Sequence, residues 1–265
     1  MKAFKLILVF LILSSPLGIA AQSLSPKELA TAKPWKLVQF NFGLGADNDH
    51  YNSMSFQHLM TMAKDPSEMQ RDLVGFDEEV TTITAGAALY GNVGFAPLDP
   101  STGQYRDDRE LQFGIGFHSP KEAMVSYKNQ GLDTSIVYCN LQSEITLETA
   151  YILKGRWGKK LQWYAGLGMN GGATFNNKMV LISGQYLEPG EHPSELDHAI
   201  QESYAAKSVL YSRVYVPYGL HYQVSSNWQL GFDFRTGVGA QFIQGEKADF
   251  IKKTGALVIG ARYKI

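Results

Sequence analysis

The sequence predicts an all-β fold: a transmembrane, antiparallel, up-and-down β-barrel, most simply of eight strands. Three observations predict it. Apolar and polar residues alternate in several runs along the chain, long and short connections between these runs alternate, and the tryptophans fall near the ends that the short connections join. The 265 residues also include 26 glycines and 12% aromatic residues, a composition that favours strands in an exported chain.

The first residues predict export. Lys2 and Lys5 precede an apolar run, and small residues follow up to Ala21, which is the layout of a cleaved signal peptide. The single cysteine, Cys139, excludes an internal disulfide, so an exported chain must be held together by other means. The expected segments are a signal peptide at residues 1–21, a short periplasmic tail at 22–34 and a barrel domain at 35–265.

The apolar residues recur with the period of two that marks a strand with two unlike faces. In the first run, Val38, Phe40 and Phe42 alternate with polar residues and glycine. The run at 228–240 repeats this pattern, with its aromatic and leucine side chains on one face. The eight predicted strands are residues 35–44, 80–95, 109–118, 145–154, 161–172, 209–223, 228–240 and 255–265.

Segments between these strands also carry patterns. Residues 123–128 and 134–141 look extended, and we expect them to continue the third and fourth strands beyond the membrane as a hairpin. An extra strand pair, giving ten strands, is the alternative. Farther upstream, Phe56, Leu59 and Met60 have helical spacing, so a short helix that packs on the barrel rim is expected.

The lengths of the connections predict the location. Connections after the first, third, fifth and seventh strands are long, whereas the fourth and sixth strands are followed only by residues 155–160 and 224–227. An outer-membrane barrel has long extracellular loops, short periplasmic turns and both chain ends in the periplasm. We therefore expect the chain in the outer membrane, surrounded by its lipid, with an aromatic girdle at the periplasmic interface. The predicted girdle consists of Trp35, Trp157, Trp163, Trp228 and Tyr222.

The predicted inward face carries three acids and three bases. Buried charges must be paired, so we expect a network of ion pairs that fills the lumen. The alternative is that some of these groups sit at the wet ends of the barrel. An eight-stranded barrel is only wide enough for its own side chains, which argues against a diffusion pore. The predicted network consists of Glu110, Glu148, Arg213, Asp233, Arg235 and Arg262.

Known catalytic and nucleic-acid motifs are missing from the sequence. The chain has 24 basic and 25 acidic residues and no basic patch, so nucleic acid is excluded as a partner. His118 and Ser119 are neighbours, but adjacent strand residues point to opposite faces and cannot form one dyad. The segment from Ser119 to Glu122 fits a capped turn instead. No catalytic residue is predicted.

Two acidic segments were considered as metal sites. Asp47, Asp49 and His50 stand near the start of the first long loop, and residues 188–198 hold further acids and two histidines. Neither spacing matches a known metal loop, and solvated acidic loops explain both. We therefore expect no metal and no cofactor.

The last residues fit a signal for barrel assembly. Gly260, Tyr263 and Ile265 occupy the glycine, aromatic and hydrophobic positions of the terminal pattern that the barrel-assembly machinery reads, although Val258 stands where a polar residue is expected. This machinery is an expected partner during biogenesis. The last strand must also pair with the first, because an open edge is not tolerated in lipid.

Two hairpins resemble a known family. Residues 144–172 read as a strand, a short basic turn and an aromatic strand that contains "YAGLG", and residues 216–235 look like a second hairpin of the same kind. These stretches are similar to small outer-membrane barrels of Bacteroidetes-type bacteria, the PorT-like group. The resemblance implies membrane insertion by the assembly machinery and implies no particular activity.

The function expected from the sequence is a structural or interaction role through the extracellular loops, without catalysis and with an unidentified loop partner. The first alternative is a soluble periplasmic lipid-binding barrel of lipocalin type, whose apolar residues would face inward and whose surface would be polar. The second alternative is a lipid-modifying enzyme of the outer membrane.

Overall fold

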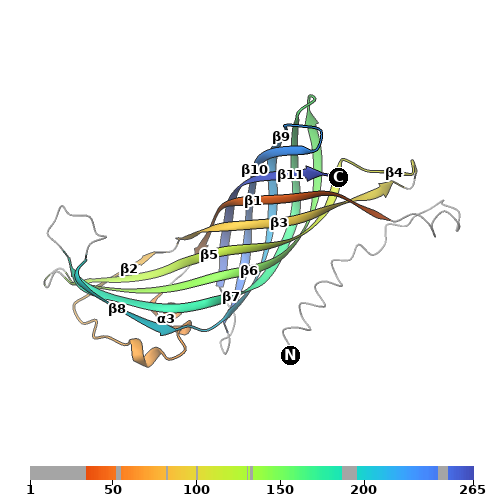
Figure 1. Ribbon diagram of the computed structural model, residues 1–265. Helices are drawn as coiled ribbons and strands as arrows, with labels where there is room; N and C mark the ends of the chain where they lie inside the picture. The colour runs from red at the N-terminus through yellow and green to blue at the C-terminus, as the bar shows by residue number, and fades with distance from the viewer. Residues whose placement is uncertain are drawn as a thin grey trace.

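The computed structural model describes residues 34–51, 55–81, 83–99, 101–129, 131, 134–186, 196–243 and 250–265 (Figure 1). The predicted signal peptide and most of the predicted periplasmic tail lie outside the described residues, as does most of the acidic segment 188–198. Among the described residues, no helix is long and apolar enough to cross a membrane.

Eight antiparallel strands close into a ring, as predicted. The pairing runs β1–β3–β5–β6–β7–β9–β10–β11, and β11 pairs with β1 from Gln39↔Lys264 to Tyr51↔Lys252. This last pairing confirms the predicted seam between the first and last strands. The ring strands are β1 (Trp35–Tyr51), β3 (Ile83–Asp99), β5 (Arg109–Asn129), β6 (Thr134–Trp157), β7 (Leu161–Tyr186), β9 (Val209–Gln223), β10 (Trp228–Ile243) and β11 (Phe250–Lys264).

The ring is apolar outside and polar inside. Large apolar side chains such as Phe42, Leu147 and Ile259 are about 60% exposed on its outer face, whereas the buried residues of the ring strands include many charged and amide side chains. This is the reverse of a soluble lipid carrier, so the lipocalin alternative is wrong. An apolar band on a closed barrel matches lipid, and the chain is an integral barrel of the outer membrane.

The predicted aromatic girdle lies at the ring end that holds the short turns and the C-terminus. Trp228 packs against Tyr263 with ring centroids 5.1 Å apart, and both are exposed. Tyr263 and Ile265 of the assembly signal also point outward, while Gly260 faces the lumen 3.5 Å from Asp233, measured from an ideal Cβ position. The remaining girdle residues occupy the same strand ends: Trp35, Trp157, Trp163 and Tyr222.

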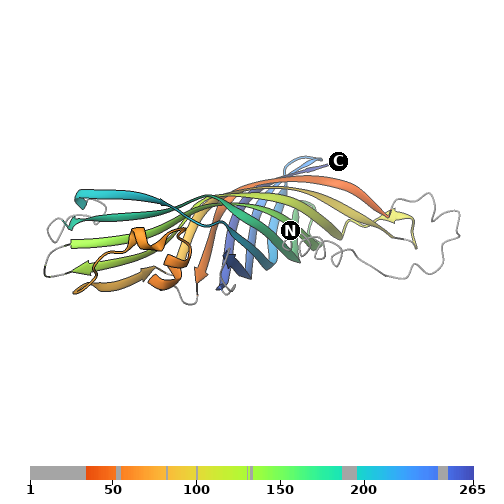
Figure 2. The same cartoon turned by 90° about the horizontal axis from the view of Figure 1, so that it is seen from below.

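Three ring strands continue far beyond the ring and form a second sheet. The pairing of β5 with β3 ends at Ala88↔His118, and that of β7 with β9 ends at Ala173↔Leu210. Past these points β5 pairs with β2 (Asp77–Thr81) and β7 pairs with β8 (Leu196–Ala205). We call the sheet β2–β5–β6–β7–β8 the outer sheet. It extends away from the ring on the side opposite the C-terminus (Figures 1 and 2).

The outer sheet explains the two extended segments that the sequence left open. Residues 123–128 and 134–141 pair with each other as continuations of β5 and β6, which confirms the predicted hairpin. The additional strands β2 and β8, and the two-residue β4 (Gln104–Tyr105), pair outside the eight-membered ring. Eight is therefore the strand count of the barrel.

The predicted helix is confirmed and packs on the outer sheet. Helix α3 (Phe56–Thr61) begins at Ser55, whose side chain accepts a hydrogen bond from the amide of His58, and the 3₁₀ helix η1 (Pro66–Met69) follows. Leu59, Met62 and Met69 are fully buried against the sheet. A closed apolar core therefore lies outside the membrane band.

Aromatic side chains fix this core. The hydroxyl of Tyr138 donates to the carbonyl of Met69 at 3.2 Å, and Phe56 packs edge-on against the ring of Tyr138 with centroids 4.8 Å apart. An isolated bridge between Ala63 and Ala206 joins the helical segment to the connection between β8 and β9. These contacts tie the segment that follows β1 to β6 and to the connection between β8 and β9.

Two local expectations are wrong. Residues 119–122 belong to β5 and form no capped turn; the register with β6 shifts between His118 and Lys121, which places Ser119 and Pro120 in a bulge that tolerates a proline. Asp47 and Asp49 lie within β1, which continues to Tyr51, because their backbone groups pair with both β3 and β11.

Replacing Met62 with alanine should loosen the helical segment without opening the ring. Truncating a fully buried methionine costs about 2–5 kcal/mol, and here only the core of the outer sheet loses the contact. Limited proteolysis should cleave residues 55–76 faster, while the heat-modifiable gel migration of the barrel stays unchanged. Val74→Ala is the matched control, since Val74 is 85% exposed. An unchanged cleavage rate in Met62→Ala would contradict the packing described.

Candidate functional site

The candidate site is the polar interior of the ring. The structure places all six charged residues predicted for the lumen on the inward face. Four of them are at most 8% exposed, and the side chains of Asp233 and Arg235 are 17% and 13% exposed. Each has an oppositely charged or histidine partner on another strand of the ring. They form two separate clusters, one toward the periplasmic end and one toward the outer end.

The first part of the periplasmic cluster is centred on Glu110. Lys154 forms an ion pair with this carboxylate, and the amides of Gln39 and Gln112 donate to it at 2.9 and 2.8 Å. Gly94 makes room for this arrangement, since a Cβ there would lie 2.0 Å from an oxygen of Glu110. Two hydrogen bonds to one oxygen and an ion pair to the other thus compensate this fully buried carboxylate.

The second part of the periplasmic cluster is centred on Asp233. Its carboxylate lies 2.8 Å from Nε2 of His221 and 4.0 Å from the guanidinium of Arg262. The ring of Tyr164 stacks on His221 at 5.2 Å between centroids, and Arg262 lies 4.6 Å from the centroid of the same tyrosine. Stacking and cation–π contacts thus fill the space around the charges.

The outer cluster contains a bidentate pair. Arg235 binds Glu148 through both terminal nitrogens, at 2.6 and 3.3 Å. The guanidinium also lies 4.0 Å from the ring centroid of Tyr90 and 5.4 Å from that of Tyr215. The planar arginine is therefore held from its edge by the carboxylate and from its faces by aromatic rings, a geometry that lysine cannot reproduce.

A second arginine bridges two acids. Nη2 of Arg213 lies 2.7 Å from Glu144 and 3.2 Å from Asp49, and its guanidinium lies 4.2 Å from the ring centroid of Tyr211. These three charged residues come from β9, β6 and β1, so the contact joins strands across the lumen.

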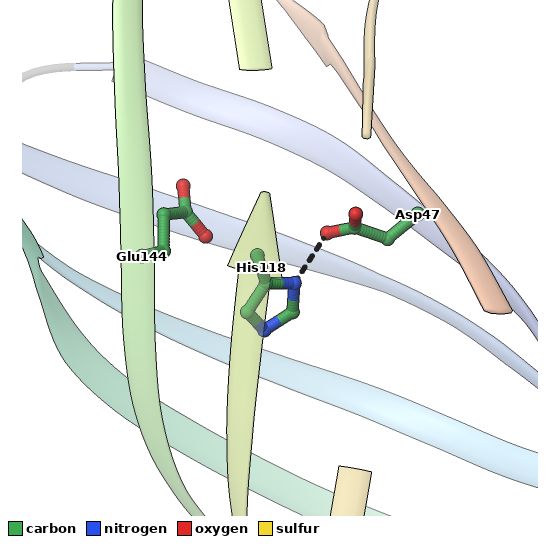
Figure 3. A group of neighbouring side chains, drawn as sticks. All are labelled: Asp47, His118 and Glu144. Carbon is green, nitrogen blue, oxygen red and sulfur yellow. Dashed lines mark hydrogen bonds and ion pairs between the residues drawn. The ribbon is translucent and has the colours of Figure 1, made fainter. Parts of the chain in front are cut away.

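His118 completes the outer cluster. Its Nδ1 lies 2.8 Å from Asp47, and one ligand-type atom from each of Asp47, His118 and Glu144 lies within 4.8 Å of the others (Figure 3). Ser119 lies on the opposite face of β5, where its hydroxyl accepts a hydrogen bond from the amide of Ala87 at 2.8 Å. The two residues do not form a dyad.

A small cavity of about 30 Å³ adjoins His118 in the outer cluster. This is room for one or two water molecules and too little for an organic substrate. The polar residues lining the cavity include Asp47, Asp49, His118, Asn170, Arg213 and Arg235.

Sequence reasoning missed half of the network, although the signal was present. Lys154 follows Glu148 by six residues on β6, and residues an even number apart share a strand face. Asp47 likewise lies four residues after Gly43, and His221 lies two residues after Gly219, so each shares a strand face with that glycine. The missed residues of the two clusters are Asp47, Asp49, His118, Glu144, Lys154 and His221.

No protein-family model matches the chain, and no curated protein matches it in sequence. Among solved structures, the chain is similar to the outer membrane protein OprG from Pseudomonas aeruginosa, at 11% identity and a TM-score of 0.38, with 87% of this chain and 97% of that one covered. It is also similar to Neisserial surface protein A, at 15% identity and a TM-score of 0.28, with 84% and 97% covered.

A third similar structure is the outer membrane protease OmpT from Escherichia coli, at 9% identity and a TM-score of 0.30, with 93% of this chain and 100% of that one covered. Identities and scores of this size carry no argument about what this chain does.

Breaking the Arg235–Glu148 pair on one side should destabilise the barrel strongly. Arg235→Met or Glu148→Gln leaves one group without its charged partner and should each lower the free energy of unfolding by about 3–5 kcal/mol, whereas the double variant should lose less than the sum. Urea unfolding in lipid vesicles measures all three.

The exposed pair Arg156–Asp107 is the matched control for this cycle. Its coupling should stay below about 1 kcal/mol, because both side chains are exposed. Equal coupling in the two pairs would mean that the lumen does not isolate its charges from water.

Proposed function

We propose that the protein is a closed outer-membrane barrel that holds its outer sheet at the cell surface as a structural or interaction platform, without catalytic activity. The observation that carries this proposal is the division of the molecule into two parts. The ring is filled by paired charges, and the outer sheet extends beyond it with an apolar core of its own.

The edges of the outer sheet support a platform role, because ion pairs add to the backbone pairing and the apolar core that order them. Arg71, in the segment after η1, forms an ion pair with Glu202 of β8, and Lys128 of β5 lies 2.6 Å from Glu79 of β2. A surface that is already ordered loses little conformational entropy when it binds. The outer sheet thus has the construction expected of a recognition surface.

The enzyme alternative has less support. His118 is only 2% exposed, and the adjoining cavity of about 30 Å³ has no room for a lipid or peptide. Catalysis on a macromolecular substrate needs a reachable nucleophile or base. We therefore favour a role that depends on the surface of the molecule.

Membership of the PorT-like group stays a prediction from the sequence. The hairpin that carries the resemblance forms β6, a short turn at residues 158–160, and β7. Assembly by the general barrel-assembly machinery is part of the same proposal, with the outward-facing Tyr263 and Ile265 as candidate recognition residues.

A closed lumen predicts the absence of steady conductance. Purified protein in planar bilayers should give no stable open channel, because paired side chains occupy the ring interior. A 16-stranded porin in the same bilayers is the positive control. Steady, large conductance from the folded protein would contradict a closed barrel.

A platform at the cell surface predicts a neighbour that contacts the outer sheet. A photo-crosslinking residue at Ile200, which is 62% exposed on β8, should capture a discrete species in native membranes. The matched control is Leu147, equally exposed on the lipid-facing band, where only lipid should be captured. Lipid alone at both positions would count against an interaction role.

A further inference from the structure

An open groove lies on the outward face of the ring, at the seam where the first and last strands meet. Its volume is about 420 Å³, which is within the range of sites that hold small ligands. The groove is lined by four aromatic side chains: Phe40 and Phe42 of β1, Trp228 of β10 and Tyr263 of β11. These three strands are neighbours in the ring (Figure 1).

Three of the lining residues form one row across the seam. In the register of the strands, Tyr263 lies beside both Phe40 and Trp228. The rings of Trp228 and Tyr263 pack with centroids 5.1 Å apart and an interplanar angle of 59°, so they stand at an angle to each other and do not form a flat surface. This row lies at the level of the aromatic girdle, to which Trp228 belongs.

The next row toward the cell surface is low at its centre. Ala261 lies beside Phe42 on one side and beside Leu230 on the other. It points outward like Tyr263, because side chains two residues apart share a strand face. Phe42 and Leu230 are large and exposed, whereas the alanine between them contributes only a methyl group. The groove therefore extends from the girdle toward the part of the ring that hydrocarbon surrounds.

The surroundings of the groove determine its occupant. It is continuous with the apolar band that faces lipid, so acyl chains are the molecules that reach it. It also lies toward the end of the ring that holds the short turns, which is the periplasmic end, and the periplasmic leaflet of an outer membrane consists of phospholipid. Among the described residues that line the groove, none is charged, so the acyl chain and not the headgroup charge provides the main contact.

Two of the lining side chains also carry a hydrogen-bond donor. Within the described part of the chain, neither the indole N–H of Trp228 nor the hydroxyl of Tyr263 has a hydrogen-bond partner. Aromatic residues at a membrane interface keep an apolar body in contact with the chains and a polar tip in the headgroup layer. Both donors are therefore available to the ester or phosphate oxygens of a lipid.

We propose that the groove formed by β1, β11 and β10 binds one phospholipid molecule of the periplasmic leaflet. One acyl chain lies over Ala261, and the ester or phosphate oxygens accept hydrogen bonds from Trp228 and Tyr263. Lipids around a smooth apolar surface exchange freely, whereas the aromatic walls of this groove add contact area and retain the bound molecule during extraction. The site is independent of the outer sheet and of any partner that the outer sheet binds.

The test uses the full mature chain extracted in a mild detergent, with native mass spectrometry to count the lipids that remain bound. The wild type from native membranes should retain one phospholipid per chain, and titration of delipidated protein with phosphatidylethanolamine should restore this stoichiometry. Ala261→Leu fills the hollow between Phe42 and Leu230 and should bind this lipid at least about tenfold more weakly.

Ala165→Leu is the matched control. Ala165 of β7 also points outward two residues from a girdle tryptophan, Trp163, but here the indole lies over Gly155 of the neighbouring strand, within 2.3 Å of an ideal Cβ position on that glycine. The same addition of side-chain volume at this position should leave phospholipid binding at the wild-type level.

Heat-modifiable gel migration shows whether each variant is folded. If Ala261→Leu does not fold, Phe42→Ala, which removes one wall of the groove, should show the same loss of binding. The proposal would be overturned by a wild type that retains no phospholipid or retains lipopolysaccharide instead. Wild-type binding in the folded groove variant, or an equal loss in Ala165→Leu, would also overturn it.

Discussion

Every feature of this molecule depends on the requirement that no backbone amide or carbonyl remain unpaired in lipid. The pairing of β1 with β11 meets it by removing the last two edges of the ring. Closure then divides every strand into an inner and an outer face, because successive residues alternate. Apolar side chains such as Phe42 and Ile259 face lipid. The side chains that alternate with them along each strand point inward and must fit a narrow interior.

The interior meets this demand by pairing charges between different strands. Each major contact joins different elements: Arg235 of β10 to Glu148 of β6, Arg213 of β9 to Glu144 of β6, and Lys154 of β6 to Glu110 of β5. The first two contacts fix the relative positions of strands that are not hydrogen-bonded neighbours, whereas the third reinforces the pairing of the adjacent strands β5 and β6. The network is thus part of how the ring keeps one shape.

Sequence alone predicted the ring well, because alternation is a local signal repeated eight times. It failed where the decisive information is not local. The stretch around Asp47 and Asp49 looks like a loop by composition, and only pairing on both sides makes it a strand. The bulge at Ser119 and Pro120 likewise has the residue pattern of a capped turn when only the sequence is considered. The partners of His118 could not be derived, since Asp47 and Glu144 approach it only after the barrel has closed.

The outer sheet is built from the same strands as the membrane band and continues past it for roughly 40 Å along β7, at about 3.3 Å per residue. The length of the outer sheet can therefore change in evolution without a change in the ring. Insertions near the β5–β6 turn leave the ring untouched when they add an even number of residues to a strand, whereas an odd number turns the side chains beyond that point to the other face. A lineage could lengthen, shorten or resurface the exposed part of this protein in steps of two while the barrel beneath it stayed the same.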